Sequence, residues 1–145
     1  MATTKIKAIN DSLKRVINYV LNPEKCGHTS VINCTNTDLA HKEMMSTKER
    51  WDKKYGIQGY HLIQSFKPNE TTPEQAHQVG IELCKRVLSD YQVVISTHID
   101  CNHLHNHVVF NSVSFKDGYK YYDGRTDCGR FAGEKECVTG IVKAR

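Results

Sequence analysis

Four of the eight histidines in this chain, His98, His103, His105 and His107, fall within ten consecutive residues. An even spread along the 145 residues would place fewer than one histidine there. Imidazole is the commonest metal-binding side chain, and three imidazoles leave coordination positions open for water or substrate, as catalytic metal sites do. The cluster therefore predicts that His98, His105 and His107 bind one divalent metal.

The spacing of these residues indicates how they could meet. His105 and His107 lie two residues apart, so on a strand their rings emerge on the same face. If the strand ending at His98 pairs with the next strand through a short polar turn, its ring returns beside them. Asp100 could orient one imidazole through its second nitrogen, and His103 lies at the turn, near the site.

Two alternative interpretations of the cluster remain. The histidines could be surface residues of a strand that titrate near neutral pH without a role. They could also hold a structural zinc, although none of the six cysteines forms a C-x-x-C pair, which argues against a zinc ribbon.

Hydrophobic periodicity predicts the elements that position these residues. A strand over residues 4–9 leads into a helix that Asn10 or Asp11 caps and that Asn22-Pro23 ends. Tyr19 points about 130° away from the apolar stripe of this helix, toward a polar flank. The stripe comprises Leu13, Val16, Ile17, Val20 and Leu21.

The rest of the chain alternates between the two kinds of element. We expect strands over residues 31–34, 57–67, 91–98 and 104–115, helices over 38–54 and 72–89, and a hairpin partner over 119–122. The helix predicted over residues 72–89 has its buried stripe at Ala76, Val79, Leu83 and Val87. This order predicts an α+β sandwich, a largely antiparallel sheet with helices packed on one face. We expect one domain over residues 1–145, which could lack a C-terminal part, and residues 123–145 show weak periodicity.

Composition narrows the class of protein. The chain is 39% hydrophobic and 25% charged, with 3 Pro and 9 Gly, which excludes collagen-like, low-complexity and wholly disordered proteins. The net charge of +4 permits a polyanionic partner without demanding one. No apolar run approaches the roughly 18 residues of a membrane span, and the N-terminus lacks the apolar stretch of a secretory signal, so we expect a cytoplasmic protein.

Three segments resemble, in order and spacing, the motifs of the mobilisation relaxases, which are DNA-nicking enzymes of plasmids and conjugative transposons in the HUH endonuclease superfamily. The string from His98 through Asp100, His103, His105 and His107 to Asn111 resembles their third motif. Residues 16–21, around Tyr19, resemble the first motif, and residues 60–66, around Ser65, resemble the second. One departure is Asn106, which stands where the superfamily usually carries a bulky apolar residue.

The resemblance implies roles for individual residues. Tyr19 would be the nucleophile, and Ser65 would contact DNA near the nick. His61 and Lys67 share the polar face of the Ser65 strand, so DNA would lie across that face, with Asn111 as a further contact. His103 would help to activate Tyr19 or steady the phosphate. The predicted fold becomes an HUH relaxase-like sandwich.

The resemblance also implies the reaction and its partners. It implies metal-dependent, site- and strand-specific nicking of DNA through a 5′-phosphotyrosyl intermediate, which initiates conjugative mobilisation. The family points to Mg²⁺ or Mn²⁺, whereas three imidazoles by softness also suit Zn²⁺ or Ni²⁺. The partners would be single-stranded DNA at an origin of transfer, accessory mobilisation proteins and a coupling protein, in a bacterial cytoplasm.

Three other functions compete with this hypothesis. They are a replication-initiation endonuclease of the same superfamily, a metal-dependent phosphodiesterase that uses a bound hydroxide, and a noncatalytic DNA-binding or metal-stabilised module. Replication initiators typically carry the tyrosine after the histidine motif, so the early position of Tyr19 disfavours the first. A tyrosine-dependent covalent DNA adduct would separate the relaxase from the other two.

Overall fold

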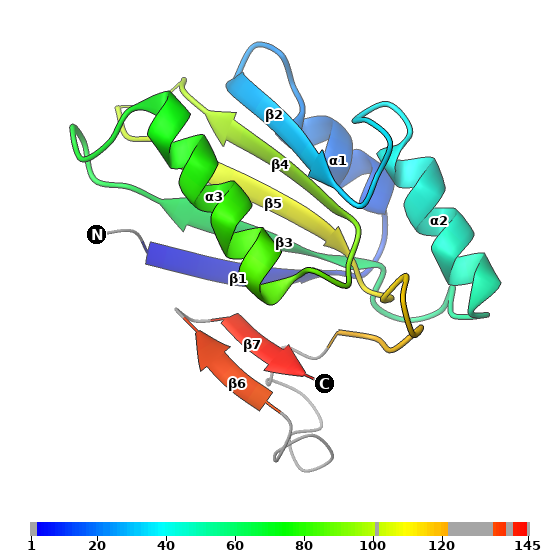
Figure 1. The fold of residues 1–145 in the computed structure, drawn as a ribbon. Helices are drawn as coiled ribbons and strands as arrows, with labels where there is room; N and C mark the ends of the chain where they lie inside the picture. The colour runs from blue at the N-terminus through cyan, green and yellow to red at the C-terminus, as the bar shows by residue number, and fades with distance from the viewer. Residues whose placement is uncertain (1–2, 101, 122–134, 139–140, 145) are drawn as a thin grey trace.

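The computed structural model of the chain describes residues 3–100, 102–121, 135–138 and 141–144. Its centre is a five-stranded sheet in the order β1-β3-β5-β4-β2, with every neighbouring pair antiparallel (Figure 1). The strands are β1 (Thr3–Ile9), β2 (Cys26–Ile32), β3 (Gly59–Ser65), β4 (Val93–His98) and β5 (His105–Asn111), and the helices are α1 (Leu13–Val20), α2 (Ala40–Arg50) and α3 (Pro73–Val87). The predicted α+β class and antiparallel sheet are confirmed.

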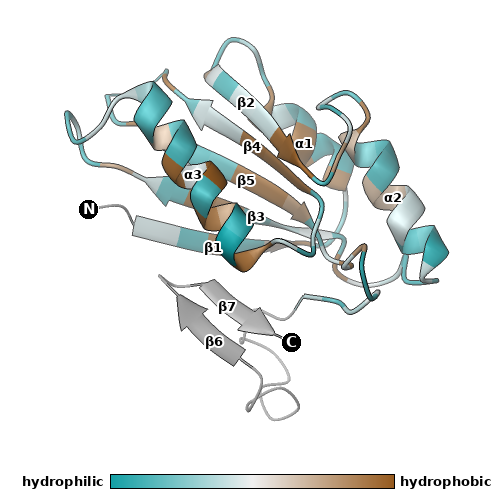
Figure 2. Cartoon of the chain, in the orientation of Figure 1, coloured by the Kyte–Doolittle hydropathy of each residue, from teal (hydrophilic) through white to brown (hydrophobic). Residues whose placement is uncertain are grey.

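The helices cover both faces of the sheet, so the prediction that they pack on one face is wrong. Leu83 and Val87 of α3 pack in one core with alternate residues of β4 and β5, such as Ile95 and Val108. The residues between these, including Val94, lie in a second core with α1 and α2. Figure 1 shows α3 and α1 on opposite sides of the sheet, and Figure 2 shows apolar residues along β4 and β5. Strands buried on both faces carry continuous apolar runs.

The first and third helices begin at side-chain caps. Ser12, and not Asn10 or Asp11 as predicted, caps α1: its hydroxyl accepts a hydrogen bond from the Arg15 backbone N–H. Thr72 caps α3 by accepting from the Gln75 N–H, as the sequence predicts. Each cap satisfies one N–H that the first helical turn leaves without a partner.

The structure differs from the predicted elements at other places. β2 begins at Cys26 instead of residue 31. Val79 is 43% exposed, and Gly80 is buried against the sheet in its place. Among the residues described after β5, a single bridge joins Val113 and Lys120 where a full hairpin was predicted.

The predicted strand end at residue 122 and much of the segment 123–145 lie outside the described residues. Within that segment, β6 (Lys135–Val138) pairs antiparallel with β7 (Ile141–Ala144) as a separate two-stranded sheet. No helix among the described residues has the length and apolar content needed to cross a membrane.

Asn106 is accommodated beneath α3 by a satisfied polar network. It is fully buried, accepts a hydrogen bond from the Thr97 hydroxyl and donates to Gln64 and to the Ala76 carbonyl. A Cβ on Gly80 would lie only 2.7 Å from the Asn106 amide nitrogen. The missing side chain of Gly80 therefore makes room for the Asn106 amide beneath α3.

Candidate active site

The pairing of β4 with β5 gathers the histidines at one end of the sheet, on the face that α1 partly covers. His98 and His105 are direct cross-strand partners, and His107 lies opposite Ser96, two residues along. The ring centroids of His98 and His107 are 4.0 Å apart, and those of His105 and His107 are 6.1 Å apart. The structure thus brings together the three residues predicted from parity and turn geometry.

A hydrogen bond to the end of α1 fixes the tautomer of His98. Its Nε2 lies 2.9 Å from the carbonyl oxygen of Val20, which can only accept, so Nε2 carries the proton and Nδ1 keeps its lone pair. The same carbonyl accepts from the Ser96 hydroxyl at 2.6 Å. These two bonds tie the last turn of α1, and with it Tyr19, to the histidine strands.

His61 forms a hydrogen bond with His107 on the side of its ring away from the cavity. Its Nε2 lies 2.8 Å from Nδ1 of His107, which leaves Nε2 of His107 as the atom available to a ligand. Burial, together with neighbouring positive groups, lowers the pKa of His107 to about 3 and that of His61 to about 4. Burial also lowers the pKa of His105. Imidazoles with such pKa values are neutral near pH 7, the form in which histidine binds metal.

Tyr19 lies beside this histidine cluster, on its solvent-exposed side. Its side chain is 49% exposed, and its ring centroid lies 6.0 Å from those of both His98 and His107. The ammonium of Lys25 lies 5.7 Å from the centroid of the same ring. The direction predicted for Tyr19, away from the apolar stripe of its helix, places the phenol beside the histidines.

These groups border one open cavity of about 600 Å³. Ser65 lines it at the end of β3, opposite His105 across the strand pair. Two lysines, Lys5 from β1 and Lys25 from the loop after α1, bring positive charge to its walls. Its lining is Thr3, Thr4, Lys5, Tyr19, Lys25, Ile63, Ser65, His98, Asp100, His105 and His107.

Four of the predicted site residues do not line this cavity. His61 lies behind His107, and Lys67 is exposed beyond the end of β3. His103 is exposed at the turn, with its ring centroid 4.4 Å from that of His105. Asn111 is fully buried under α2, where it accepts from the Lys48 ammonium and donates to the Met44 carbonyl and to Gln92. Because its side chain is fully buried, Asn111 cannot make the predicted contact with DNA.

The imidazole nitrogens of His98, His105 and His107 suit a divalent metal, although the three rings do not converge on one point. Nδ1 of His98 and Nε2 of His107 are left available by their hydrogen bonds, and both rings border the cavity with His105. Among the side chains that the structure describes, no three His, Cys, Asp or Glu residues form a ready ligating group. Binding of one metal by all three imidazoles therefore requires these rings to move from the positions that they have in the structure.

Sequence reasoning missed the lysines of the cavity. Lys25 follows a helix end and Lys5 alternates on an edge strand, so neither belongs to a motif. The available signal was the alternation of Lys5 and Lys7 with Ile6 and Ala8, which places both lysines on the face opposite the α3 core.

The family model for the relaxase nuclease domain, described as "Relaxase: MobA/VirD2-like, nuclease domain", matches residues 19–133. The chain belongs to this relaxase family. The match extends from the tyrosine of α1 through all the histidine positions described above, so Tyr19 and the histidine cluster lie within the matched residues.

Curated relatives agree with this assignment. The relaxase chain is 39% identical to "Protein rlx" of Staphylococcus aureus over 141 residues, which cover 96% of this chain and 42% of the relative. It is 31% identical over 140 residues to "Group II intron-interrupted relaxase LtrB" of Lactococcus lactis subsp. cremoris, covering 77% of this chain and 25% of that protein. The chain therefore spans about two fifths or less of these relatives.

A solved structure shares the fold of this relaxase chain. The chain from "Molecular Basis of Vancomycin Resistance Transfer in Staphylococcus aureus" matches with a TM-score of 0.60 at 12% identity, covering 88% of this chain and 78% of that one. At this identity the likeness concerns the fold, and it agrees with the antiparallel α+β sheet described above.

Proposed function

We propose that the chain is a relaxase nuclease domain that nicks one DNA strand through a covalent bond to Tyr19 and so initiates mobilisation. The observation that carries this proposal is the position of the Tyr19 ring, 6.0 Å from two histidine rings on the wall of an open cavity. A nucleophile and an imidazole cluster sharing one cavity suit metal-assisted transfer of a phosphoryl group.

The reaction exchanges one phosphodiester for another. The Tyr19 Oη forms a bond to the scissile phosphorus while the bond from phosphorus to the 3′ oxygen breaks. The phenolic proton leaves to water in the open cavity, and the departing 3′ oxygen takes a proton from water. The product is a 5′-phosphotyrosyl enzyme and a free 3′ hydroxyl, so a later attack by that hydroxyl can rejoin the strand.

A phenol with an ordinary pKa near 10 is a weak nucleophile, so the phosphate must be made more electrophilic. A divalent metal held by His98, His105 and His107 would supply that polarisation. Mg²⁺ or Mn²⁺ fits the relaxase family, and Zn²⁺ or Ni²⁺ fits the softness of the three imidazoles. His61 would orient the ring of His107, and the Val20 carbonyl would orient the ring of His98.

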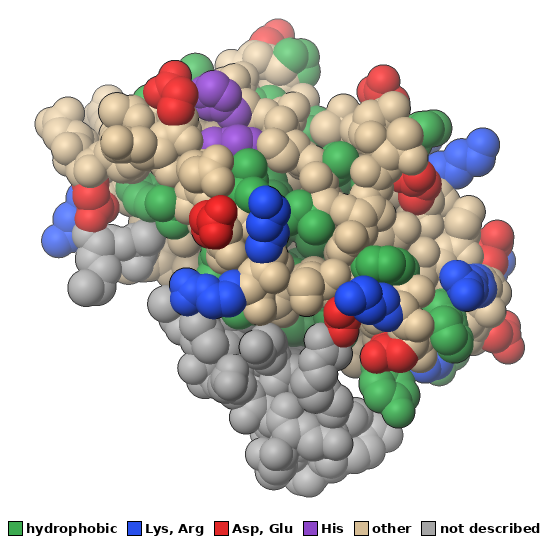
Figure 3. Space-filling view, viewed as in Figure 1, with side chains coloured by type: hydrophobic (Ala, Val, Ile, Leu, Met, Phe, Trp, Pro, Cys, Tyr) green, Lys and Arg blue, Asp and Glu red, His purple; other side chains and the backbone are tan. Residues whose placement is uncertain are grey.

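The DNA would approach along the open part of the sheet face. The side chains of Lys5 and Lys7, two residues apart on β1, lie on that face. Ser65 lies at the cavity wall on the neighbouring strand, β3. Figure 3 shows the α3 face, where acidic and basic side chains are interspersed. We therefore place single-stranded DNA from an origin of transfer on the cavity face, in a bacterial cytoplasm, where accessory mobilisation proteins and a coupling protein would join it.

A covalent-adduct assay tests the proposal. Wild-type protein, incubated with divalent metal and single strands that carry the origin of transfer, should form a protein–DNA adduct that survives denaturant. Mass spectrometry should find the 5′ phosphate on Tyr19. Tyr19→Phe removes only the phenolic oxygen, so it should bind DNA equally and form no adduct.

Two results would contradict the proposal. Cleavage by Tyr19→Phe at the wild-type rate would favour a phosphodiesterase that uses hydroxide. An adduct on Tyr60, Tyr91 or Tyr121 would move the nucleophile elsewhere, although these three rings are buried in the α3 core.

A further inference from the structure

A lysine outside the recognised motifs, Lys25, stands directly beside the nucleophile. Its Nζ lies 5.7 Å from the centroid of the Tyr19 ring and 3.6 Å from the nearer carboxylate oxygen of Asp100. All three residues line the same cavity. Lys25 and Asp100 are each about one third exposed, with side-chain accessibilities of 37% and 34%, so solvent and a ligand can reach both.

The backbone holds Lys25 firmly at this place. Its N–H donates to the Asn22 carbonyl at 3.0 Å, in the turn that closes α1, and its carbonyl accepts from the Ile99 N–H at 2.9 Å, just beyond β4. The loop is therefore bonded to the two elements that carry Tyr19 and His98. These bonds place the backbone of Lys25 between the helix that carries Tyr19 and the strand that carries His98.

We propose that Lys25 binds a phosphate oxygen of the DNA strand at the nick, with Asp100 holding its ammonium beside Tyr19. This inference rests on the proposed function. An ammonium has three N–H donors, and one carboxylate oxygen at 3.6 Å can engage only one of them, so the others remain available to an anion. Two lysines line the cavity, and the ammonium of one of them, Lys25, lies 5.7 Å from the centroid of the Tyr19 ring.

The chemistry requires a positive charge at this point. The phosphate carries a negative charge into the cavity, and the attacking phenol carries electrons toward the same atom. A fixed ammonium lowers the repulsion between them. Lys25 keeps its proton throughout, so the atoms and protons of the nicking step balance as before. An exposed Lys–Asp pair contributes little to stability by itself, so loss of function can be separated from loss of folding.

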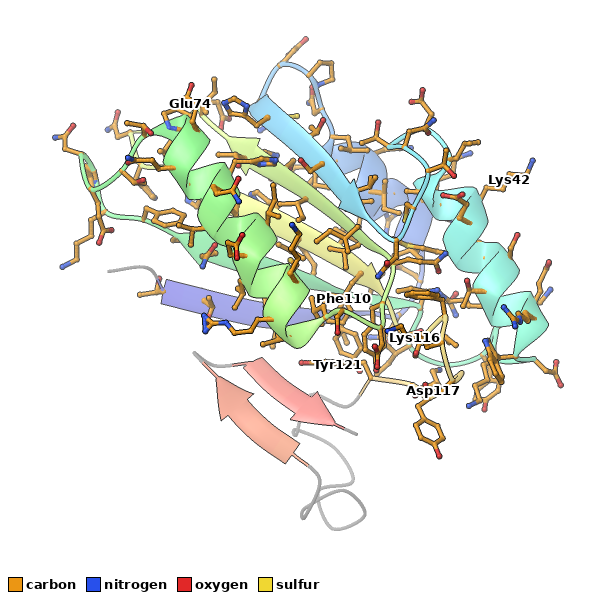
Figure 4. The ribbon with its side chains drawn as sticks, in the orientation of Figure 1. Lys42, Glu74, Phe110, Lys116, Asp117 and Tyr121 are labelled. Atoms are coloured by element: carbon orange, nitrogen blue, oxygen red, sulfur yellow. The ribbon has the colours of Figure 1, made fainter. Side chains whose placement is uncertain are left out.

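Salt dependence of DNA binding tests the contact. A fluorescein-labelled single-stranded oligonucleotide is titrated with Tyr19→Phe protein, which cannot cleave it, over a range of salt concentrations. Adding Lys25→Met should reduce the slope of log affinity against log salt by about 0.7, the value for one lost phosphate contact on a single strand. Lys25→Arg should restore the slope. Lys42→Met is the matched control, because Lys42 points from α2 into solvent (Figure 4).

Cleavage by proteins that retain Tyr19 provides the second measurement. Lys25→Met should lower the rate of adduct formation by about tenfold or more at saturating DNA. Asp100→Asn keeps the positive charge and removes the group that aims it, so it should retain or improve DNA affinity while it slows cleavage. A purely structural role for the pair would lower affinity and rate together.

The outcomes separate this inference from the proposed function. If Lys25→Met and Lys42→Met show the same salt slope and the same cleavage rate, the inference is wrong while the relaxase function stands. If Lys25→Met lowers the slope but the wild type forms no adduct on Tyr19, the phosphate contact is supported and the proposed nucleophile is not. A wild type that binds no single-stranded DNA would overturn both.

Discussion

His61 and His107 face each other across β3 and β5, with Nε2 of the first 2.8 Å from Nδ1 of the second. They are not direct cross-strand partners: His61 pairs with Val109 and His107 with Ile63, so the contact is diagonal. One ring donates and the other accepts, which fixes the orientation of His107 and leaves its Nε2 toward the cavity. A residue predicted to contact DNA lies where it can position a proposed metal ligand.

Replacing His61 should weaken metal binding without abolishing it. His61→Leu leaves Nδ1 of His107 without its partner, and loss of such an outer contact typically lowers metal affinity 10- to 100-fold. Titration calorimetry on chelator-stripped protein measures the change. His105→Ala combined with His107→Ala should remove binding altogether, and His41→Leu on α2 serves as the control. Wild-type affinity in His61→Leu would show that the histidine pair does not serve the metal.

Ser65→Ala should impair strand cleavage more than folding. The hydroxyl lies on the cavity wall at the end of β3, so its loss removes a contact to DNA near the nick. One partly exposed hydroxyl contributes under about 1 kcal/mol to stability, so the melting temperature should barely change. Single-turnover cleavage and thermal melting measure the two effects. Cleavage at the wild-type rate would remove Ser65 from the site.

Local rules accounted for the gathering of the histidines. Side chains alternate along a strand, and a short turn between antiparallel strands returns the chain beside itself, so the parity of His105 and His107 and the place of His98 followed from sequence alone. The same reasoning placed Tyr19 off the stripe of α1. These inferences needed only neighbours along the chain or across one turn.

Features that depend on distant packing were not predictable in this way. Asn111 continues the histidine motif in sequence, yet α2 covers its end of β5 and buries it beside Lys48. The sequence did contain one unused signal: the runs Val93–Ile95 and Val108–Phe110 are apolar at every position. Such runs indicate burial on both faces and would have predicted helices on both sides of the sheet.

Gly80→Ala should destabilise the fold although alanine favours helices. The added methyl group would lie 2.7 Å from the Asn106 amide nitrogen, which is held by Gln64 and the Ala76 carbonyl. Moving that amide breaks hydrogen bonds worth about 1 kcal/mol each, against a gain of up to about 1 kcal/mol in helix propensity. We expect a net loss of about 1 kcal/mol in urea unfolding. Gln78→Ala, exposed on the same helix, should cause no such loss, and a stabilised Gly80→Ala would show that Asn106 has room to move.

Lys48 should make the stability of the protein depend on pH. Its side chain is fully buried between α2 and the sheet, where its ammonium donates to Asn111. Burial, with a smaller contribution from Lys120, lowers the pKa of Lys48 from 10.5 to about 7. Between these two values the unfolded chain binds a proton that the folded chain does not, so the free energy of unfolding increases with pH across this window.

Below pH 7 the lysine is charged in both states, and the cost of burying that charge is present in full. As the pH rises from 7 toward 10.5, the folded protein holds a neutral amine and the cost is progressively relieved, by at most about 1.4 kcal/mol per pH unit. Lys48→Met removes this contribution. Urea unfolding of both proteins at pH 6, 7, 8 and 9 should therefore show wild-type stability gaining on the variant above pH 7 and running parallel to it below. Lys42→Met, which removes an exposed ammonium from the same helix, should track the wild type at every pH. Parallel curves for wild type and Lys48→Met across the whole range would mean that Lys48 stays charged in the folded protein.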